Sequence, residues 1–273
     1  MIGIPVALVL TIVLAAGSAR ADDSERELEL GGRERTYRLH LPANADPTES
    51  LPLVIVMHGA GGNPRVIELQ SGFSELADSR GFAVAYPAGT RSRFAALMTL
   101  LRGRHFTWNA GECCGWAQKN EIDDVAFLRA LVEDVARTHP IDRARVYAAG
   151  LSNGGMMAYR LACEASDSFA AIGVVAGALV TPGCAPSRPV SVIHMHAKGD
   201  PIVPFGGGAG AFSRDGFSYP PTQSAIDFWT GANGGRAAVE LRALDSTRHN
   251  WPKDASETLW EFFASHPRPE ETR

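Results

Sequence analysis

The segment from Gly150 to Gly154, GLSNG, places a serine between two glycines in the pattern G-x-S-x-G. The apolar run RVYAA directly before it predicts a β-strand, and GMMAYRLAC directly after it predicts a helix. A sharp turn between a strand and a helix pushes the serine hydroxyl out above the edge of a sheet, where it can attack a carbonyl carbon. A plain glycine-rich turn is the simpler interpretation, but the flanking strand and helix favour Ser152 as a nucleophile.

A serine hydroxyl is a weak nucleophile at neutral pH, so it needs a base, and the base needs a group that orients it. In this arrangement the three residues follow one another along the chain as serine, acid and histidine. Asp200 ends the apolar stretch that begins at Ile193, and His249 lies further on, before the last predicted helix. We therefore expect His249 to take the proton of Ser152, and Asp200 to orient the imidazole.

The oxyanion that forms in such an attack needs N–H donors. Asn153, directly after the serine, supplies one backbone N–H, and a second is expected from a loop after an early strand. The run HGAGG follows the apolar run LVIVM, and its glycines let the backbone approach a substrate closely. We expect the second donor to be the N–H of Ala60, with Gly59 as its neighbour.

A pair of histidines is a candidate metal site. His194 and His196 stand two residues apart on a predicted strand, so both side chains point to one face. No third ligand is spaced nearby. We therefore expect neither a metal ion nor an organic cofactor.

Strands and helices alternate along the chain. Gly31 and Gly32 separate two short alternating runs and predict a β-hairpin. The predicted strands cover residues 28–30, 36–41, 53–57, 82–86, 145–149, 171–175, 190–194 and 239–244. The predicted helices cover residues 66–80, 122–136 and 156–163, and a last helix opens at Asp254. This alternation indicates an α/β fold with a mostly parallel sheet, helices on both faces and an antiparallel hairpin at its start.

Residues 90–106 interrupt this alternation with apolar residues bordered by arginines. A mobile lid over an active site and a surface helix in a long loop both fit this segment, and the surface helix is the commoner feature. The formal net charge is −4, with 26 basic and 30 acidic residues, and this balance argues against nucleic acid as a partner.

The N-terminus has the features of a secretory signal peptide. Residues 1–16 are almost wholly apolar, and Ala19-Arg20-Ala21 fits a small-residue cleavage site, although no basic residue precedes the apolar run. We expect residues 1–21 to be removed and residues 22–273 to form a single catalytic domain. The mature protein is then expected to be secreted or periplasmic and to have no membrane span.

Export permits disulfide bonds, and the four cysteines allow three pairings if all are oxidised. Neighbours such as Cys113 and Cys114 bridge each other only with strain, so the pairing of Cys163 with Cys184 is favoured. Buried free thiols are the alternative.

Several stretches of the chain resemble the secreted esterases of the polyhydroxybutyrate depolymerase-like type, whose relatives include feruloyl and acetyl xylan esterases. These stretches are LPLVIVMHGAGGN, YPAGT, TWNAGECCGWAQKNEIDDVAFLRALVEDV, RVYAAGLSNGGMMAYRLACEAS and FAAIGVVAGAL. The resemblance covers residues 36–266 and implies an α/β-hydrolase fold. It also implies hydrolysis of hydroxyalkanoate oligomers or of feruloyl or acetyl esters. It assigns Ser152, Asp200 and His249 to the family's catalytic triad.

Three features depart from the family pattern. Residues 246–248, Ser-Thr-Arg, stand where the family usually has glycines before the catalytic histidine. Ala197 replaces the glycine of the usual HGxxD motif, and residues 229–239 are shortened. These departures motivate the alternative that the chain is a non-catalytic binding protein with this fold.

Aromatic and acidic residues near the adjacent cysteines also match the family. Trp108 and Trp116 form an aromatic wall for a phenolic or sugar group, or else they pack under a loop. Asp123 and Asp124 precede a predicted helix, and we expect both to act as helix N-terminal acids.

Overall fold

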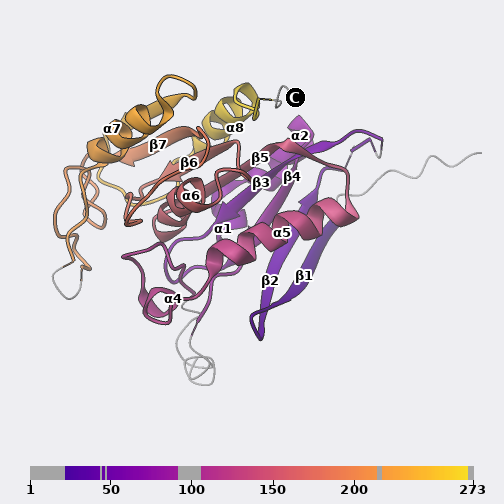
Figure 1. Ribbon diagram of the computed structural model, residues 1–273, viewed down its shortest axis with the longest axis horizontal. Coiled ribbons are helices and arrows are strands. Elements are labelled where there is room, and N and C mark those ends of the chain that lie inside the picture. Colours follow the sequence, from indigo (N-terminus) through magenta and orange to yellow (C-terminus); the bar gives the residue numbers. More distant parts are fainter. Residues whose placement is uncertain (1–21, 44, 47, 92–105, 214–216, 270–273) are drawn as a thin grey trace, which may run out of the picture.

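A sheet of eight strands organises the part of the chain that the structure describes (Figure 1). The computed structural model describes residues 22–43, 45–46, 48–91, 106–213 and 217–269. The strand order is β1-β2-β4-β3-β5-β6-β7-β8. The strands are β1 (Asp22–Leu30), β2 (Arg33–Leu41), β3 (Leu51–Met57), β4 (Ala83–Pro87), β5 (Ile141–Leu151), β6 (Ala171–Val175), β7 (Ser191–Ala197) and β8 (Val239–Leu244).

The first two strands form the predicted antiparallel hairpin. Gly31 and Gly32 make its turn with φ angles of 58° and 67°, which glycine adopts without a steric penalty. β2 also pairs with β4 in the antiparallel sense, whereas the strands from β4 to β8 in the sheet order pair in parallel. The predicted α/β class and the mostly parallel sheet are confirmed, and β1 begins at Asp22 rather than at residue 28.

The helices are α1 (Pro64–Ser71), α2 (Phe73–Arg80), α4 (Gly115–Lys119), α5 (Asp124–Thr138), α6 (Asn153–Glu164), α7 (Thr222–Asn233) and α8 (Ala255–Ser265). The single helix predicted over residues 66–80 is wrong. Gly72 adopts a φ of 63°, and its N–H donates to the Glu68 carbonyl, which ends α1 before α2 begins. Helices α4 and α7 were not predicted from the sequence.

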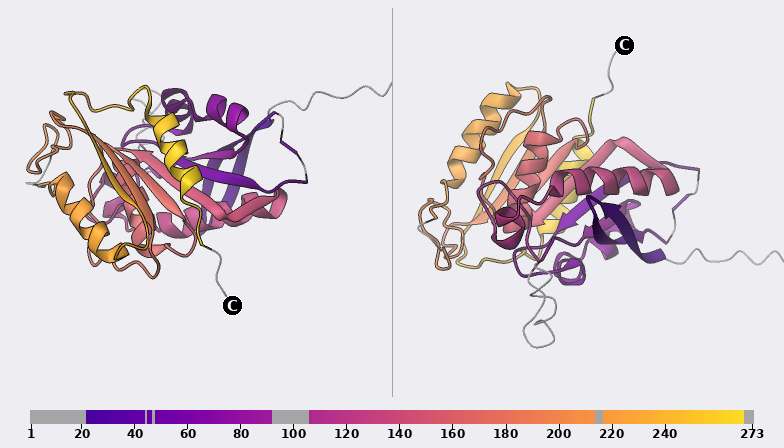
Figure 2. Two further views of the ribbon diagram at one scale, coloured as in Figure 1. Left: turned by 90° about the horizontal axis from the view of Figure 1, so that it is seen from above. Right: turned by 60° about the horizontal axis from the view of Figure 1, so that its bottom comes forward.

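Helices cover both faces of the sheet, because alternate residues of the buried strands point to opposite sides. α5, α6 and α7 pack on one face, and α1, α2 and α8 pack on the other (Figure 2). The first core includes Leu53, Ile55, Phe127, Leu161 and Trp229, and the second includes Val54, Val56, Phe73, Leu259 and Phe263. The expected helical cover of both faces is confirmed.

The parallel strands end at one edge of the sheet, where the candidate catalytic residues lie. His58 directly follows β3, and Ser152 directly follows β5. Asp200 lies just after β7, and His249 lies on the segment between β8 and α8. Ligands of open α/β sheets bind at the carboxyl ends of the strands, so this edge is the expected place for a site.

Two disulfide bonds are present. Cys163 at the end of α6 pairs with Cys184, with the two Cα atoms 4.9 Å apart, which confirms the favoured pairing. The adjacent Cys113 and Cys114 are also paired, contrary to expectation. The bond between Cys163 and Cys184 leaves these two as each other's only possible partners within the chain.

The predicted signal peptide and most of residues 90–106 lie outside the described residues. Within the described ranges, no helix has both the length and the apolar character needed to cross a membrane.

Candidate active site

Ser152 occupies a strained turn between β5 and α6. Its φ of 55° and ψ of −119° are unusual for a residue with a side chain, because they bring the Cβ close to the backbone. The Ser152 N–H donates to the Val175 carbonyl of β6 at 2.8 Å, which holds the turn against the sheet. Backbone strain of this kind is found at functional sites, where the surrounding structure maintains it.

The glycines on either side of Ser152 allow three segments to meet. A Cβ on Gly150 would lie 2.3 Å from the Gly154 carbonyl carbon, and a Cβ on Gly154 would lie 2.3 Å from the Met57 carbonyl oxygen. Real side chains do not make such contacts, so only glycine lets the start of α6 approach the ends of β3 and β5. The G-x-S-x-G spacing therefore has a structural cause, which is the close packing of this turn.

Asp200 and His249 are hydrogen-bonded to each other. The His249 Nδ1 lies 2.7 Å from the Asp200 Oδ2, and the two side chains are 15% and 0% exposed. The Asp200 Oδ1 accepts the N–H groups of Ile202 and Val203 at 2.8 and 3.1 Å. These contacts leave the His249 Nε2 as the ring atom available to act on a proton.

Burial alone would raise the pKa of Asp200, but hydrogen bonds from His196 and His249 oppose it. The charge of His249 and the Ile202 N–H act in the same direction, so the pKa of this carboxyl is lowered below its usual range. Asp200 is therefore ionised at neutral pH, as the partner of a general base must be.

The loop after β3 lies against Ser152. A Cβ on Gly59 would come within 3.4 Å of the Ser152 Cβ. The Gly59 carbonyl accepts the N–H of Gly62 at 3.0 Å and lies 2.8 Å from the His58 Nδ1. In a trans peptide the C=O and the N–H point in opposite directions. Because the Gly59 carbonyl faces these two groups, the Ala60 N–H points away from them. Within the described residues, the N–H groups of Ala60 and Asn153 have no hydrogen-bond acceptor.

The tautomer of His58 follows from its contacts. The Gly89 N–H donates to the His58 Nε2 at 3.0 Å, so this nitrogen has to be an acceptor. The proton then lies on Nδ1, which donates to the Gly59 carbonyl. Burial lowers the pKa of His58 to about 4, and the ring is neutral at pH 7. The predicted oxyanion loop therefore depends on His58, which was not among the predicted site residues.

The side chain of Asn153 holds a second loop beside the site. Its Oδ1 accepts the Trp108 N–H at 2.7 Å, and its Nδ2 donates to the Trp108 carbonyl at 3.0 Å. The Trp108 ring is fully buried, and its Nε1–H donates to the His58 carbonyl at 2.9 Å. This position gives the ring no contact with solvent, so the structure supports packing rather than the predicted role in an aromatic wall for the substrate.

Trp116 lies on α4 and is half-buried. The Arg33 guanidinium of the β1–β2 hairpin lies 5.4 Å from the centre of its ring, as in a cation–π contact. The structure thus places Trp116 beside the hairpin, and its predicted role in substrate binding remains an expectation.

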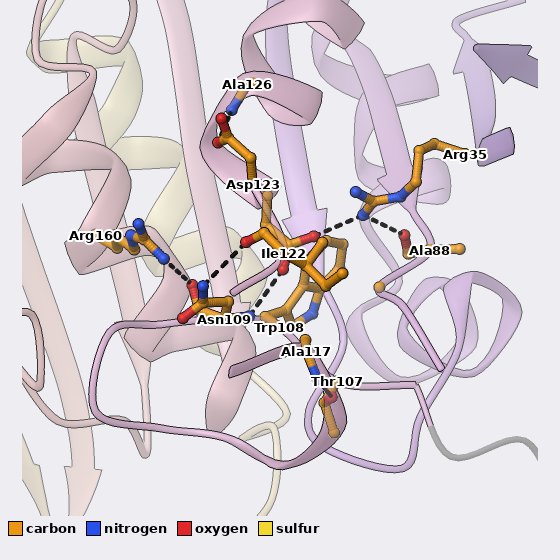
Figure 3. A network of polar contacts seen from close by, with 12 residues as sticks. Arg35, Ala88, Thr107, Trp108, Asn109, Ala117, Ile122, Asp123, Ala126 and Arg160 are labelled. Atoms are coloured by element: carbon orange, nitrogen blue, oxygen red, sulfur yellow. Dashed lines mark hydrogen bonds and ion pairs between the residues drawn. The ribbon is translucent and has the colours of Figure 1, made fainter. Parts of the chain in front are cut away.

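A network of polar contacts also holds the segment that contains Trp108 and Asn109 (Figure 3). Asp124 is fully buried, pairs with the Arg35 guanidinium at 2.7 Å and accepts the Asn109 N–H at 2.8 Å. Asn109 also donates to the Ile122 carbonyl at 3.0 Å. The expectation that Asp124 is a helix N-terminal acid omits its main role, because burial allows this carboxylate to pair with Arg35.

Asp123 behaves as expected. It is the N-cap of α5, and its side chain accepts the Ala126 N–H at 2.9 Å. Its side chain points to the surface, whereas that of Asp124 points inward.

A small apolar cluster lies beside the candidate site. Met156 is four residues after Ser152, and Val203 is three residues after Asp200. Both belong to a cluster of buried residues. Other side chains, which are partly exposed, pack against this cluster. The partly exposed members are Cys114, Ile202, Phe217 and Tyr219. Burial raises the pKa of Tyr219, and the charge of Asp200 adds to this effect.

The residues that depart from the family pattern form an ordered path to His249. The Ser246 carbonyl accepts the Gly199 N–H at 2.9 Å, and the Ser246 hydroxyl accepts the Arg248 N–H at 3.1 Å. A Cβ on Gly199 would lie 2.8 Å from the Thr247 Cγ2, so the two segments are in close contact. The altered loop therefore docks on the Asp200 loop and keeps the Asp200–His249 hydrogen bond.

The comparisons with known proteins identify the family of this chain. Residues 35–226 match the family described as "Esterase PHB depolymerase". The chain is 36% identical over 192 residues to "Putative esterase NocK" of Nocardia uniformis subsp. tsuyamanensis, a match that spans 69% of this chain and 52% of that relative. It is 28% identical over 250 residues to "Feruloyl esterase C" of Emericella nidulans, covering 86% of this chain and 85% of the relative.

The fold is shared with solved esterases. The structure of "Acetyl xylan esterase from Aspergillus awamori" superposes with a TM-score of 0.63 at 15% identity, covering 88% of this chain and 99% of that one. The family match extends from β2 into α7 and includes Ser152 and Asp200. The chain therefore belongs to the Esterase PHB depolymerase family, whose members are carboxylic ester hydrolases.

Proposed function

We propose that this chain is a serine esterase in which Ser152, His249 and Asp200 form a catalytic triad. The observation that carries the proposal is the hydrogen bond from the His249 Nδ1 to the buried Asp200 carboxylate, at the sheet edge that also bears Ser152 in its strained turn. Asp200 fixes the proton on Nδ1, which leaves Nε2 free to accept the proton of the Ser152 hydroxyl.

The reaction proceeds in two halves. The Ser152 Oγ attacks the ester carbonyl carbon as its proton passes to His249. The oxyanion receives hydrogen bonds from the N–H groups of Ala60 and Asn153, with Gly59 allowing the close approach. The C–O bond to the alcohol then breaks, and His249 protonates the leaving oxygen. Water attacks the resulting acyl-serine by the same route and releases the acid.

The family match and the apolar cluster that contains Met156 and Val203 support the proposed substrate class. We propose esters with an apolar acyl or alcohol group, either hydroxyalkanoate oligomers or feruloyl or acetyl esters. Export of a single catalytic domain, residues 22–273, is part of this proposal, because the first 21 residues have the pattern of a signal peptide.

A non-catalytic binding protein is the less supported alternative. Residues 246–248 motivate this alternative, but the segment docks on the Asp200 loop through the Ser246 carbonyl. The hydrogen bond between Asp200 and His249 is also intact, so the altered residues do not disrupt the pair.

The test measures hydrolysis of p-nitrophenyl butyrate and labelling by a fluorophosphonate probe. Ser152→Ala is expected to abolish both, whereas Ser265→Ala, on the exposed face of α8, is expected to leave both unchanged. Activity of the Ser152→Ala variant at the wild-type rate would overturn the proposal, and a folded wild-type protein without labelling would favour the binding protein. Methyl ferulate, acetylated xylan and 3-hydroxybutyrate oligomers then identify the substrate.

A further inference from the structure

A chain of buried polar side chains reaches the Asp200 carboxylate from the interior. It begins at Tyr159 of α6 and continues through His194 and His196 of β7. The Tyr159 Oη lies 2.8 Å from the His194 Nδ1, and the His194 Nε2 lies 3.0 Å from the His196 Nδ1. The His196 Nε2 lies 2.8 Å from the Val203 carbonyl oxygen and 3.4 Å from the Asp200 Oδ2. The mechanism above uses none of these three side chains.

The proton positions along this chain can be deduced from its two ends. The Val203 carbonyl only accepts hydrogen bonds, so the His196 Nε2 carries a proton. At the other end, His194 is the only hydrogen-bond partner of the fully buried Tyr159 hydroxyl among the described residues. If this hydroxyl accepted from His194, its own hydrogen would have no acceptor, and a buried unsatisfied donor costs about 1–3 kcal/mol.

One arrangement satisfies every group with neutral rings. Tyr159 donates to the His194 Nδ1, the His194 Nε2 donates to the His196 Nδ1, and the His196 Nε2 donates to Val203 and Asp200. Burial lowers the pKa of His194 well below its usual value, in keeping with a neutral ring. Thr222 adds a second contact at 3.2 Å to the His196 Nδ1. Each hydrogen bond in this row of side chains is thus donated in the direction of Asp200.

His196, the last of these hydrogen-bonded side chains, holds the turn that carries Asp200. The Asp200 Oδ1 accepts the backbone N–H groups of Ile202 and Val203, and the His196 Nε2–H donates to the carbonyl of the same Val203. His196 therefore contacts both the carboxylate and the turn that orients it. A neutral donor does this without cancelling the negative charge that stabilises protonated His249 during the reaction.

We propose that His196 is a positioning residue of the triad, and that Tyr159 and His194 keep the proton on its Nε2 so that it holds Asp200 toward His249. This inference rests on the proposed function, because it assigns His196 a role only if Asp200 and His249 are the acid and the base.

The test compares His196→Leu, which removes the donor, with His196→Gln, whose amide N–H can occupy the place of Nε2. The matched control is Ile193→Val, a change at a buried residue of the same strand that packs on the other face of the sheet. The measurements are kcat and KM for p-nitrophenyl butyrate per probe-labelled site, the melting temperature, and the downfield proton resonance of the His249 Nδ1–H.

We expect His196→Leu to lower kcat by about 10- to 100-fold, less than the roughly 10⁴-fold loss seen when a triad carboxylate is replaced by an amide. KM should change by less than about threefold, because no substrate contact is removed. The His249 resonance should shift or broaden. His196→Gln should recover most of kcat, and Ile193→Val should lower the melting temperature without changing kcat.

The outcomes separate the two proposals. If Ser152→Ala remains active, the proposed function fails. If Ser152→Ala is inactive but His196→Leu keeps the wild-type kcat and His249 resonance, only this inference fails. It also fails if the Gln variant is as slow as the Leu variant. If His196→Leu does not fold, Tyr159→Phe decides the question, since it removes one oxygen and is expected to lower kcat about threefold with KM unchanged.

Discussion

At the scale of single residues, hydrogen-bond direction decides what the candidate site can do. His249 needs a proton on Nδ1 and none on Nε2, and the carboxylate of Asp200 imposes this state. His58 needs the same tautomer for another reason, because the Gly89 N–H occupies its Nε2. In both cases a neighbour that can only accept or only donate selects the tautomer, and the reactive geometry follows from that choice.

The neutral state of His58 leads to a prediction for stability against pH. Its pKa is about 4 in the folded protein and 6.5 in the unfolded chain. Between these values the unfolded chain binds a proton that the folded protein excludes, so the free energy of unfolding falls as pH falls. The slope from this residue is at most about 1.4 kcal/mol per pH unit, and its contribution is fully present above pH 6.5.

Chemical denaturation between pH 4 and 8 measures this effect. The buried His194 acts in the same direction, so the comparison is with His58→Asn. The variant is expected to be less stable at pH 8 and to lose stability less steeply as the pH falls from 6.5 to 4. Asp200 acts in a separate window, because its lowered pKa stabilises the fold above about pH 4 and this stabilisation is lost at more acidic pH. Equal slopes for the variant and the wild type would contradict the prediction.

At the scale of elements, loops gain their order from groups that lie far apart in the sequence. The segment around Trp108 is held from α6 by the Asn153 amide and from α5 by the Asp124 carboxylate. Asp124 in turn is held by Arg35 of β2. This segment therefore depends on three elements, and its position beside Ser152 depends on their packing.

The buried pair of Arg35 and Asp124 gives a prediction at this scale. Asp124→Asn leaves the Arg35 guanidinium buried without a counter-charge, so we expect a loss of about 3 kcal/mol in the free energy of unfolding. Asp123→Asn is the matched control, because asparagine caps a helix as well as aspartate does, and its effect should stay below about 0.5 kcal/mol. Urea denaturation of the two variants checks this. Equal effects would mean that the buried pair contributes nothing beyond capping.

At the scale of the whole molecule, the sheet order brings the candidate site together. β5, β7 and β8 are separated in the sequence, yet they lie within four neighbouring strands of the sheet, so their carboxyl ends present Ser152, Asp200 and His249 at one edge. The two cores hold this sheet between helical layers, which keeps the loops of one edge in register.

The link between Cys163 and Cys184 supports this layer from outside the site. It closes a loop with a sequence separation of 21 that contains β6, the strand that holds the Ser152 N–H. Replacing both residues by serine should lower the free energy of unfolding by about 3 kcal/mol, because the unfolded chain gains freedom. Thermal denaturation measures the loss, and kcat at 25 °C should stay near the wild-type value. A kcat that falls in step with stability would show that the link positions Ser152 directly.

Local patterns in the sequence were sufficient for the α/β fold, the hairpin at Gly31 and Gly32, and the role of Asp123 as a helix N-terminal acid. In each case the signal lies within a few residues, as an apolar run, a pair of glycines or an acid at the start of a helix. They were not sufficient at Gly72, which ends α1 inside the single helix predicted over residues 66–80, or for α7, which follows two prolines.

The residue types and their spacing predicted the chemical groups and their order along the chain: a serine in a turn flanked by glycines, then an acid, then a histidine. The packing of distant segments was needed to show that Trp108 is buried, that Asp124 pairs with Arg35, and that His194 and His196 belong to a row of hydrogen-bonded side chains that reaches Asp200. The physical reason is that burial and hydrogen-bond direction depend on neighbours from distant segments, and the residue types of one segment do not specify those neighbours.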